Sequence, residues 1–148
     1  MAQATAISPQ ALTQVAHAMV TTYNDRDWSK AKATMTADFI YEELATGRKL
    51  TGADQTIEAW KGWATAFPDS KGTIHGTHVA DDGTVTVELT WNGTHTGPLP
   101  MPSGTLAATG KPIEVRACAV VEVVGERARA ERHYFDMMSL LRQLGVTG

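Results

Sequence analysis

Apolar residues near the start of the chain recur at the spacing of one helical face. Ser8 and Pro9 precede them, and this pair is typical of a helix start, with serine as the N-cap and proline in the first turn. The pattern therefore predicts a helix over residues 8–24. Its apolar face consists of Leu12, Val15, Ala16, Met19, Val20 and Tyr23.

Two further helices are predicted before the chain turns mainly to sheet. A short one is expected from Trp28 to Met35, after a polar start at Asp27. Another is expected over residues 53–67, where Asp54 can cap the start and Pro68 ends the helix. Short strands are expected between the two, at Phe39–Glu43 and Lys49–Leu50.

The second half of the chain has the two-residue period of strands. Alternation is cleanest from Thr84 to Trp91, and Asp81-Asp82-Gly83 predicts a hairpin turn to a preceding strand over residues 73–79. Residues 94–110 are rich in Gly, Pro and Thr and are expected to form a loop or flap. Long strands are then predicted at Ile113–Val124 and Arg127–Phe135, followed by a short helix that Gly145 closes.

This order, with helices first and long antiparallel strands afterwards, indicates an α+β domain. We expect residues 1–148 to form one domain, a cone-shaped α+β barrel. Its N-terminal helices would pack on a strongly curved, mostly antiparallel sheet, and a short C-terminal helix would end the chain. The inside of such a cone is a natural apolar pocket.

Two apolar rows bear on assembly. The rows are Val85, Val87, Leu89 and Trp91 on one strand and Val115, Ala117, Ala119, Val121 and Val123 on another. If these two rows do not face the pocket, they form an apolar face of the sheet that no helix covers. In that case we expect a homodimer through the outer face of the sheet.

Composition narrows the class of protein. The chain is 43% hydrophobic and 20% charged, as in an ordinary globular domain. The net charge of -3 and the lack of a basic stripe argue against nucleic acid, and no apolar run approaches the roughly 18 residues of a membrane span. The start of the chain lacks the features of a secretory signal, and a single cysteine, Cys118, suits a reducing compartment. We therefore expect a cytoplasmic enzyme or binding protein.

The most suggestive chemistry lies where the last strand meets the last helix. His133 and Asp136 stand at this junction, and a carboxylate that orients an imidazole makes a useful acid–base pair near neutral pH. Residues three apart point to opposite faces of a regular strand, so a bulge or the junction itself has to bring them together. Asp136 also fits the cap of the final helix.

Five further segments match a known family: Tyr23-Asn24, Asp38-Phe39, Gly93-Thr-His-Thr-Gly97, Thr109-Gly-Lys-Pro112 and Leu141-Arg-Gln-Leu-Gly145. In these segments the chain resembles the SnoaL-like polyketide cyclases, in the superfamily of nuclear transport factor 2 and ketosteroid isomerase. The resemblance implies cofactor-free ring closure of a polyketide by intramolecular aldol condensation, with an acidic residue of the last strand as the base. The position of that acidic residue aligns with His133 in this sequence. Either His133 or Asp136 is therefore the base here, or the chain catalyses a different reaction.

The same resemblance implies further pocket residues, each with a structural alternative. The family's polar cavity positions map onto Tyr41, Arg116 and Cys118. Tyr41 could donate to an enolate oxygen or simply be a core residue, and Arg116 could hold a carboxylate or pair with a nearby glutamate. His95, at the edge of the flap, could reach over the pocket or stabilise the loop.

Two tryptophans of the third predicted helix complete the candidates. Trp60 and Trp63 could stack on a polycyclic ligand, although aromatic residues at helical spacing are more often core. Glu43 and Glu114 come next as catalytic groups if the pair at the last strand is not used.

No metal-ligand spacing, phosphate loop or serine nucleophile elbow is present in the sequence. We therefore expect an enzyme without cofactors that acts on a small apolar or aromatic carbonyl compound. Two alternatives stay open. One is a hydrolase, dehydratase or isomerase on the same scaffold, such as an epoxide hydrolase with an Asp–Arg–Asp relay. The other is a non-catalytic ligand-binding or dimerisation module, whose pocket polar groups would pair with one another.

Overall fold

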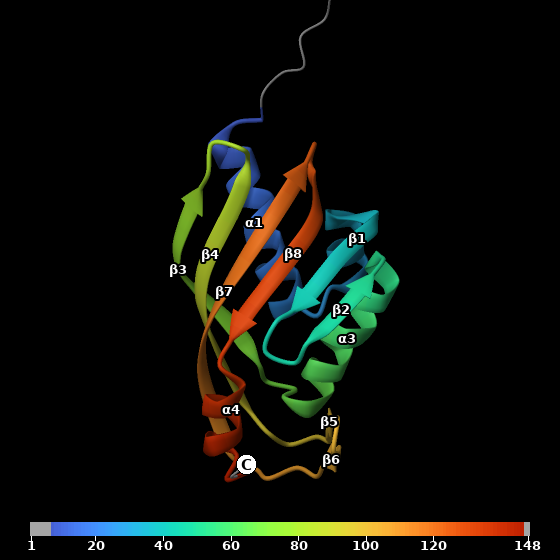
Figure 1. The fold of residues 1–148 in the computed structure, drawn as a ribbon, viewed down its shortest axis with the longest axis vertical. Helices are drawn as coiled ribbons and strands as arrows, with labels where there is room; N and C mark the ends of the chain where they lie inside the picture. Colours follow the sequence, from blue (N-terminus) through green and yellow to red (C-terminus); the bar gives the residue numbers. More distant parts are fainter. Residues whose placement is uncertain (1–6, 147–148) are drawn as a thin grey trace, which may run out of the picture.

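The computed structural model describes residues 7–146, which form helices packed against one large sheet and a small hairpin (Figure 1). None of the helices in this part of the chain has the length and apolarity that crossing a membrane requires. In chain order the elements are α1 (Pro9–Asn24), α2 (Trp28–Thr34), β1 (Met35–Glu43), β2 (Arg48–Thr51), α3 (Ala53–Ala66), β3 (Lys71–Val79), β4 (Thr84–Thr94), β5 (Leu99–Met101), β6 (Gly104–Leu106), β7 (Pro112–Val124), β8 (Arg127–Phe135) and α4 (Met137–Gln143).

The large sheet has the strand order β2-β1-β8-β7-β4-β3 and curls around α1 and α3 without closing (Figure 1). The α+β cone expected from the sequence is therefore present. Neighbouring strands run antiparallel except for β1 and β8, which pair in parallel. The alternation within each strand did not predict this parallel pair, because it joins segments from opposite ends of the chain.

Side-chain caps start α1, α2 and α4 where the sequence indicates. The Ser8 hydroxyl accepts from the backbone N–H of Ala11 at 3.1 Å, and the Asp27 carboxylate accepts from that of Lys30 at 3.1 Å. The expectation that Asp54 caps α3 was wrong. Gly52, with φ of +100°, occupies that N-cap, and Asp54 lies in the first turn.

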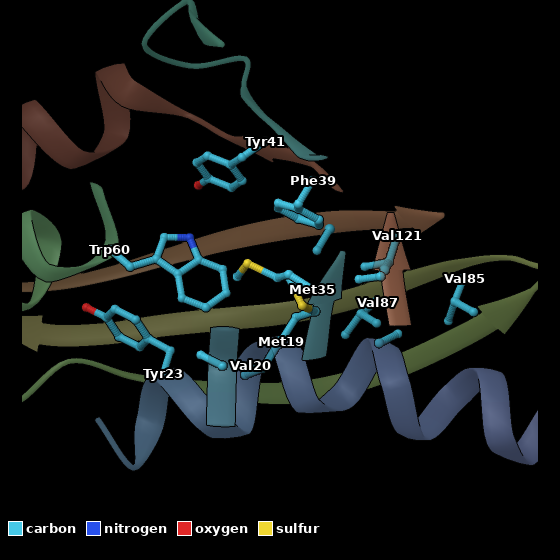
Figure 2. Packing of buried hydrophobic residues seen from close by; sticks show 14 of the residues in the cluster. Met19, Val20, Tyr23, Met35, Phe39, Tyr41, Trp60, Val85, Val87 and Val121 are labelled. Atoms are coloured by element: carbon cyan, nitrogen blue, oxygen red, sulfur yellow. The ribbon is translucent and has the colours of Figure 1, made fainter. Parts of the chain in front are cut away.

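The core lies between the sheet and α1. Val85 and Val87 of β4 and Val121 of β7 are fully buried in the same apolar cluster as Met19 of α1, part of which Figure 2 shows. The two apolar rows considered for dimerisation thus face the interior. The outer face of the same strands carries polar residues such as Glu88, so a homodimer remains a prediction without the support of an uncovered apolar face.

The segment over residues 94–110, expected to be a loop or flap, contains the β5–β6 hairpin and is anchored at both ends. The backbone N–H groups of Thr96 and Gly97 donate to the Ala66 carbonyl, at the end of α3. His95 is completely buried, stacks on Phe67 at 5.3 Å between ring centroids, and accepts at Nδ1 from the backbone N–H of Thr109 at 3.1 Å. His95 therefore fastens the far end of the segment to its near end.

Gly97 is required by this anchoring. A Cβ added there would lie 1.9 Å from the Thr65 carbonyl oxygen, whereas one added at Gly62, in α3, would meet nothing within 4 Å. We expect Gly97→Ala to lower the free energy of unfolding by on the order of 1–3 kcal/mol, because backbone has to move. Gly62→Ala should raise it by up to about 1 kcal/mol through helix propensity. Urea unfolding of both variants measures the contrast, and equal stabilities would contradict it.

The anchor should also make stability depend on pH. Burial lowers the pKa of His95, an effect that the backbone of Gly97 only partly offsets. Below the pKa of His95 in the unfolded chain, that chain binds a proton at His95, whereas the folded chain keeps His95 neutral. Stability is therefore complete above the unfolded pKa of about 6.5 and is lost as the pH falls below it.

Melting temperatures between pH 7.5 and 5.5 test this expectation. His95→Gln should show a smaller loss than the wild-type protein over that range, whereas His78→Gln, which removes an exposed histidine paired with Glu88, should not. Parallel curves for the wild type and His95→Gln would show that His95 does not set the dependence.

Candidate functional site

A narrow cavity of about 80 Å³ lies between the sheet and the helices α1 and α3. Its wall is mostly apolar and aromatic, with a few polar groups. The polar groups are those of Tyr23, Tyr41, Ser70, Glu43, Glu131 and His133. The carboxylates and the imidazole come from β1 and β8, because the parallel register places Tyr41 beside Glu131 and Glu43 beside His133.

Glu43 is buried and accepts four hydrogen bonds. Its Oε2 accepts from the Tyr41 hydroxyl and from the Trp63 indole N–H, both at 2.9 Å. Its Oε1 accepts from the Thr46 hydroxyl at 2.7 Å and from the half-exposed Arg48 guanidinium at 2.9 Å. Burial alone would raise the pKa of Glu43, but these hydrogen bonds and the charge of Arg48 bring it below its ordinary value. Glu43 is thus a stable anion and a poor base.

Glu131 and His133 form a second polar pair, two residues apart on the inward face of β8. The His133 Nε2 accepts from the Trp91 indole N–H at 3.0 Å. An indole nitrogen only donates, so Nε2 carries no proton, and Nδ1–H must donate to Glu131 Oε2 at 3.0 Å. His133 is therefore a neutral imidazole, oriented by Glu131, with its basic nitrogen at the cavity wall.

Tyr41 lines the cavity, but its hydroxyl proton is directed to Glu43. Burial raises the pKa of Tyr41 well above its usual value, and the nearby charges of Glu43 and Glu131 raise it further. Tyr41 is therefore a neutral donor to Glu43 and is not free to serve a substrate oxygen without leaving that partner.

His133 lines the cavity, as the sequence led us to expect, but Asp136 does not. Asp136 is exposed and caps α4, where its carboxylate accepts from the backbone N–H of Met138 at 3.0 Å. The expectation that the two residues converge was wrong. β8 alternates regularly from Glu131 to Phe135, so a residue three positions beyond His133 does not share its face.

Other candidates divide between the cavity and the outside of the sheet. Trp60 and Trp63 line the cavity, whereas Arg116 is exposed and Cys118 half-buried on the outer face of β7. Neither Arg116 nor Cys118 can reach the site, because Val115 and Ala119 take the inward positions of that strand. His95 lies behind Phe67 and anchors the loop.

Two functional groups were missed in the sequence, Glu131 and Trp91. Both carried a usable signal, because strand alternation puts Glu131 on the same face as His133 and Trp91 on the same face as Leu89. Glu131 stands among arginines at positions 127, 129 and 132, a pattern typical of a solvated strand face. Its arginine neighbours do face outward, but Glu131 itself is only 3% exposed.

Within residues 7–146 no three His, Cys, Asp or Glu side chains come together in a way that could hold a metal ion. The arrangement can instead hold a proton at one defined atom, His133 Nε2, inside an apolar wall.

Replacing Glu43 should be costly for folding. Glu43→Ala leaves the buried Tyr41 and Trp63 donors unpaired, so we expect the free energy of unfolding to fall by on the order of 2–4 kcal/mol in chemical denaturation. Glu122→Ala removes a carboxylate that two exposed arginines share and should cost less than about 1 kcal/mol. A Glu43 variant as stable as the Glu122 control would refute a structural role for this carboxylate.

Comparison with known proteins agrees with the fold. No curated protein sequence matches this chain. A proposed SnoaL-like polyketide cyclase from Jannaschia has a similar structure, with a TM-score of 0.82, 15% identity, and coverage of 98% of this chain and 100% of that one. So has IdmH, a proposed polyketide cyclase from Streptomyces antibioticus, with a TM-score of 0.76, 19% identity and coverage of 91% and 99%.

A third similar structure is a protein from Catenulispora acidiphila with a ketosteroid isomerase-like fold, solved in complex with trimethylamine. Its TM-score is 0.76, its identity 20%, and the match covers 95% of this chain and 96% of that one. These identities show the fold alone. The model of one family, the SnoaL-like polyketide cyclases, matches residues 13–144. The chain therefore belongs to the SnoaL-like polyketide cyclase family.

Proposed function

We propose that this protein is a cofactor-free acid–base enzyme that removes an acidic C–H proton next to the carbonyl group of a small compound bound in the cavity. The observation that carries the proposal is the Glu131–His133 pair. It fixes the imidazole tautomer so that the basic nitrogen is Nε2, on a side chain that lines the cavity.

In the proposed step, His133 Nε2 takes the proton and the substrate becomes an enolate. The imidazolium that forms is stabilised by Glu131 at Nδ1. Before this step the substrate has to displace the Trp91 N–H, because the single lone pair of Nε2 cannot take a proton while it accepts that hydrogen bond. The displaced N–H can then donate to the enolate oxygen. The enolate then attacks a second carbonyl of the same molecule and closes a ring, as polyketide cyclases do, or regains the proton at another carbon.

The alternative of an epoxide hydrolase has less support. An Asp–Arg–Asp relay needs these side chains in the cavity, yet its described wall contains neither aspartate nor arginine. Arg116 lies on the outer face of the sheet and Asp136 at the start of α4, so they cannot form two parts of such a relay.

A second candidate function, a ligand-binding module without chemistry, is favoured by one observation. The polar groups of the cavity pair with one another. Glu43 accepts four hydrogen bonds, and both nitrogens of His133 are paired. The proposed enzyme therefore requires that a substrate displace the Trp91 N–H from His133, which a binding module does not.

Exchange of carbonyl-adjacent protons for deuterium distinguishes the two functions without knowledge of the natural substrate. A panel of small ketones, neutral and bearing a trimethylammonium group, would be incubated with the protein in D₂O and followed by proton NMR. His133→Ala and Glu131→Gln should each slow the exchange by on the order of 10²-fold.

Asp136→Asn provides the matched control. It changes a carboxylate three residues from His133 that caps α4 at the surface, and asparagine is as good a cap. This variant should keep the wild-type rate. Exchange that is equally fast with wild-type protein and His133→Ala would rule out His133 as the base.

A further inference from the structure

Glu131 is a buried carboxylate without a positive partner. It is 3% exposed, and its one hydrogen bond within the described chain comes from His133. Because the Trp91 N–H fixes His133 as the neutral tautomer, that contact is not an ion pair. No lysine or arginine among the described residues lies within 4.0 Å of the Glu131 carboxylate, whereas the Glu43 carboxylate has Arg48 at 2.9 Å.

A buried charge of this kind is costly unless an opposite charge meets it. The described residues provide no positive charge for Glu131. Because Glu131 lines the cavity, a bound ligand can provide it. A cation bound in the cavity would therefore compensate the only carboxylate of the wall that this part of the chain leaves unbalanced.

The rest of the wall suits a cation as well. A continuous series of aromatic contacts, the aromatic belt, surrounds the cavity, and consecutive ring centroids lie 5.1–6.3 Å apart. Figure 2 shows part of it, with Trp60 between Tyr23 and Tyr41. The belt runs through Tyr41, Trp60, Tyr23, Trp91, His133, Phe135 and Trp63, and Glu43 joins its two ends through hydrogen bonds from Trp63 and Tyr41.

The faces of Trp and Tyr rings attract organic cations whose hydration is weak, such as alkylated ammonium groups. A compact inorganic ion would instead need several charged or strongly polar ligands at one point, and within residues 7–146 no three His, Cys, Asp or Glu side chains come together in that way. The combination of an unbalanced carboxylate with aromatic walls thus favours one ligand chemistry.

We infer that the cavity binds small organic cations, with an alkylammonium group against Glu131 and inside the aromatic belt. Insofar as it rests on the proposed function, this narrows the substrate to small carbonyl compounds that bear a protonated or quaternary nitrogen. The binding itself does not depend on whether His133 removes a proton.

Calorimetric titration with two probes of the same number of non-hydrogen atoms tests the inference. Tetramethylammonium chloride carries the charge, and tert-butanol is the neutral counterpart. At constant ionic strength, set with sodium chloride, the wild-type protein should bind tetramethylammonium at least about tenfold more tightly than tert-butanol.

Two variants with the same substitution locate the effect. Glu131→Gln keeps an acceptor for His133 Nδ1–H but removes the charge, and it should weaken tetramethylammonium binding by on the order of tenfold while leaving tert-butanol unchanged. Glu122→Gln removes a surface carboxylate and should bind as the wild type does.

Several outcomes would overturn the inference. These are equal affinity of the wild type for the two probes, no binding of tetramethylammonium, or unchanged cation affinity in Glu131→Gln. If Glu131→Gln does not fold, the preference of the wild-type protein between the probes still decides. Cation binding without proton exchange on any ketone would support this ligand class while refuting the proposed enzyme, so the two failures can be told apart.

Discussion

The carboxylate of Glu43 holds together the elements that enclose the cavity. Its four donors come from β1, the β1–β2 turn, β2 and α3, so one side chain joins the edge of the sheet to the helix above it. Such a buried anion is stable only while its donors stay in place. The positions of Trp63 and Tyr41 on the cavity wall therefore follow from the satisfaction of this charge.

The parallel pairing of β1 with β8 gives the site its electrostatic character. It brings the carboxylates of Glu43 and Glu131 to one apolar wall, and the two have different hydrogen-bond and charge partners. Glu43 has a guanidinium and three neutral donors, whereas Glu131 has a neutral imidazole. A carboxylate with a full set of hydrogen-bond donors stabilises the fold. One with fewer donors can orient a base such as His133 or bind a ligand. The fold thus separates a structural role from a chemical role in residues of the same type.

Much of the fold could be predicted because it depends on local periodicity. The helical face from Leu12 to Tyr23 and the alternation from Thr84 to Trp91 each indicate which side is buried.

The site was harder to predict, because it depends on which strands are neighbours and which face of each points inward. His133 was placed correctly, yet its partner was sought at Asp136 when alternation alone favoured Glu131. Arg116 and Cys118 were assigned to the cavity by resemblance, although Val115 and Ala117 of the same strand are the more apolar set and take the inward face. The parallel pairing, which has no local signature, brought Glu43 beside His133.

The same pairing has a consequence for how the protein forms. β1 ends at Glu43 and β8 begins at Arg127, so their contact closes a loop that contains most of the chain. Contacts between such distant segments carry a large entropic cost and tend to form late in folding. The antiparallel strands β3, β4, β7 and β8 follow one another through shorter connections and can assemble first. We therefore expect the cavity, whose carboxylates and imidazole come from segments far apart in the chain, to be completed late in folding.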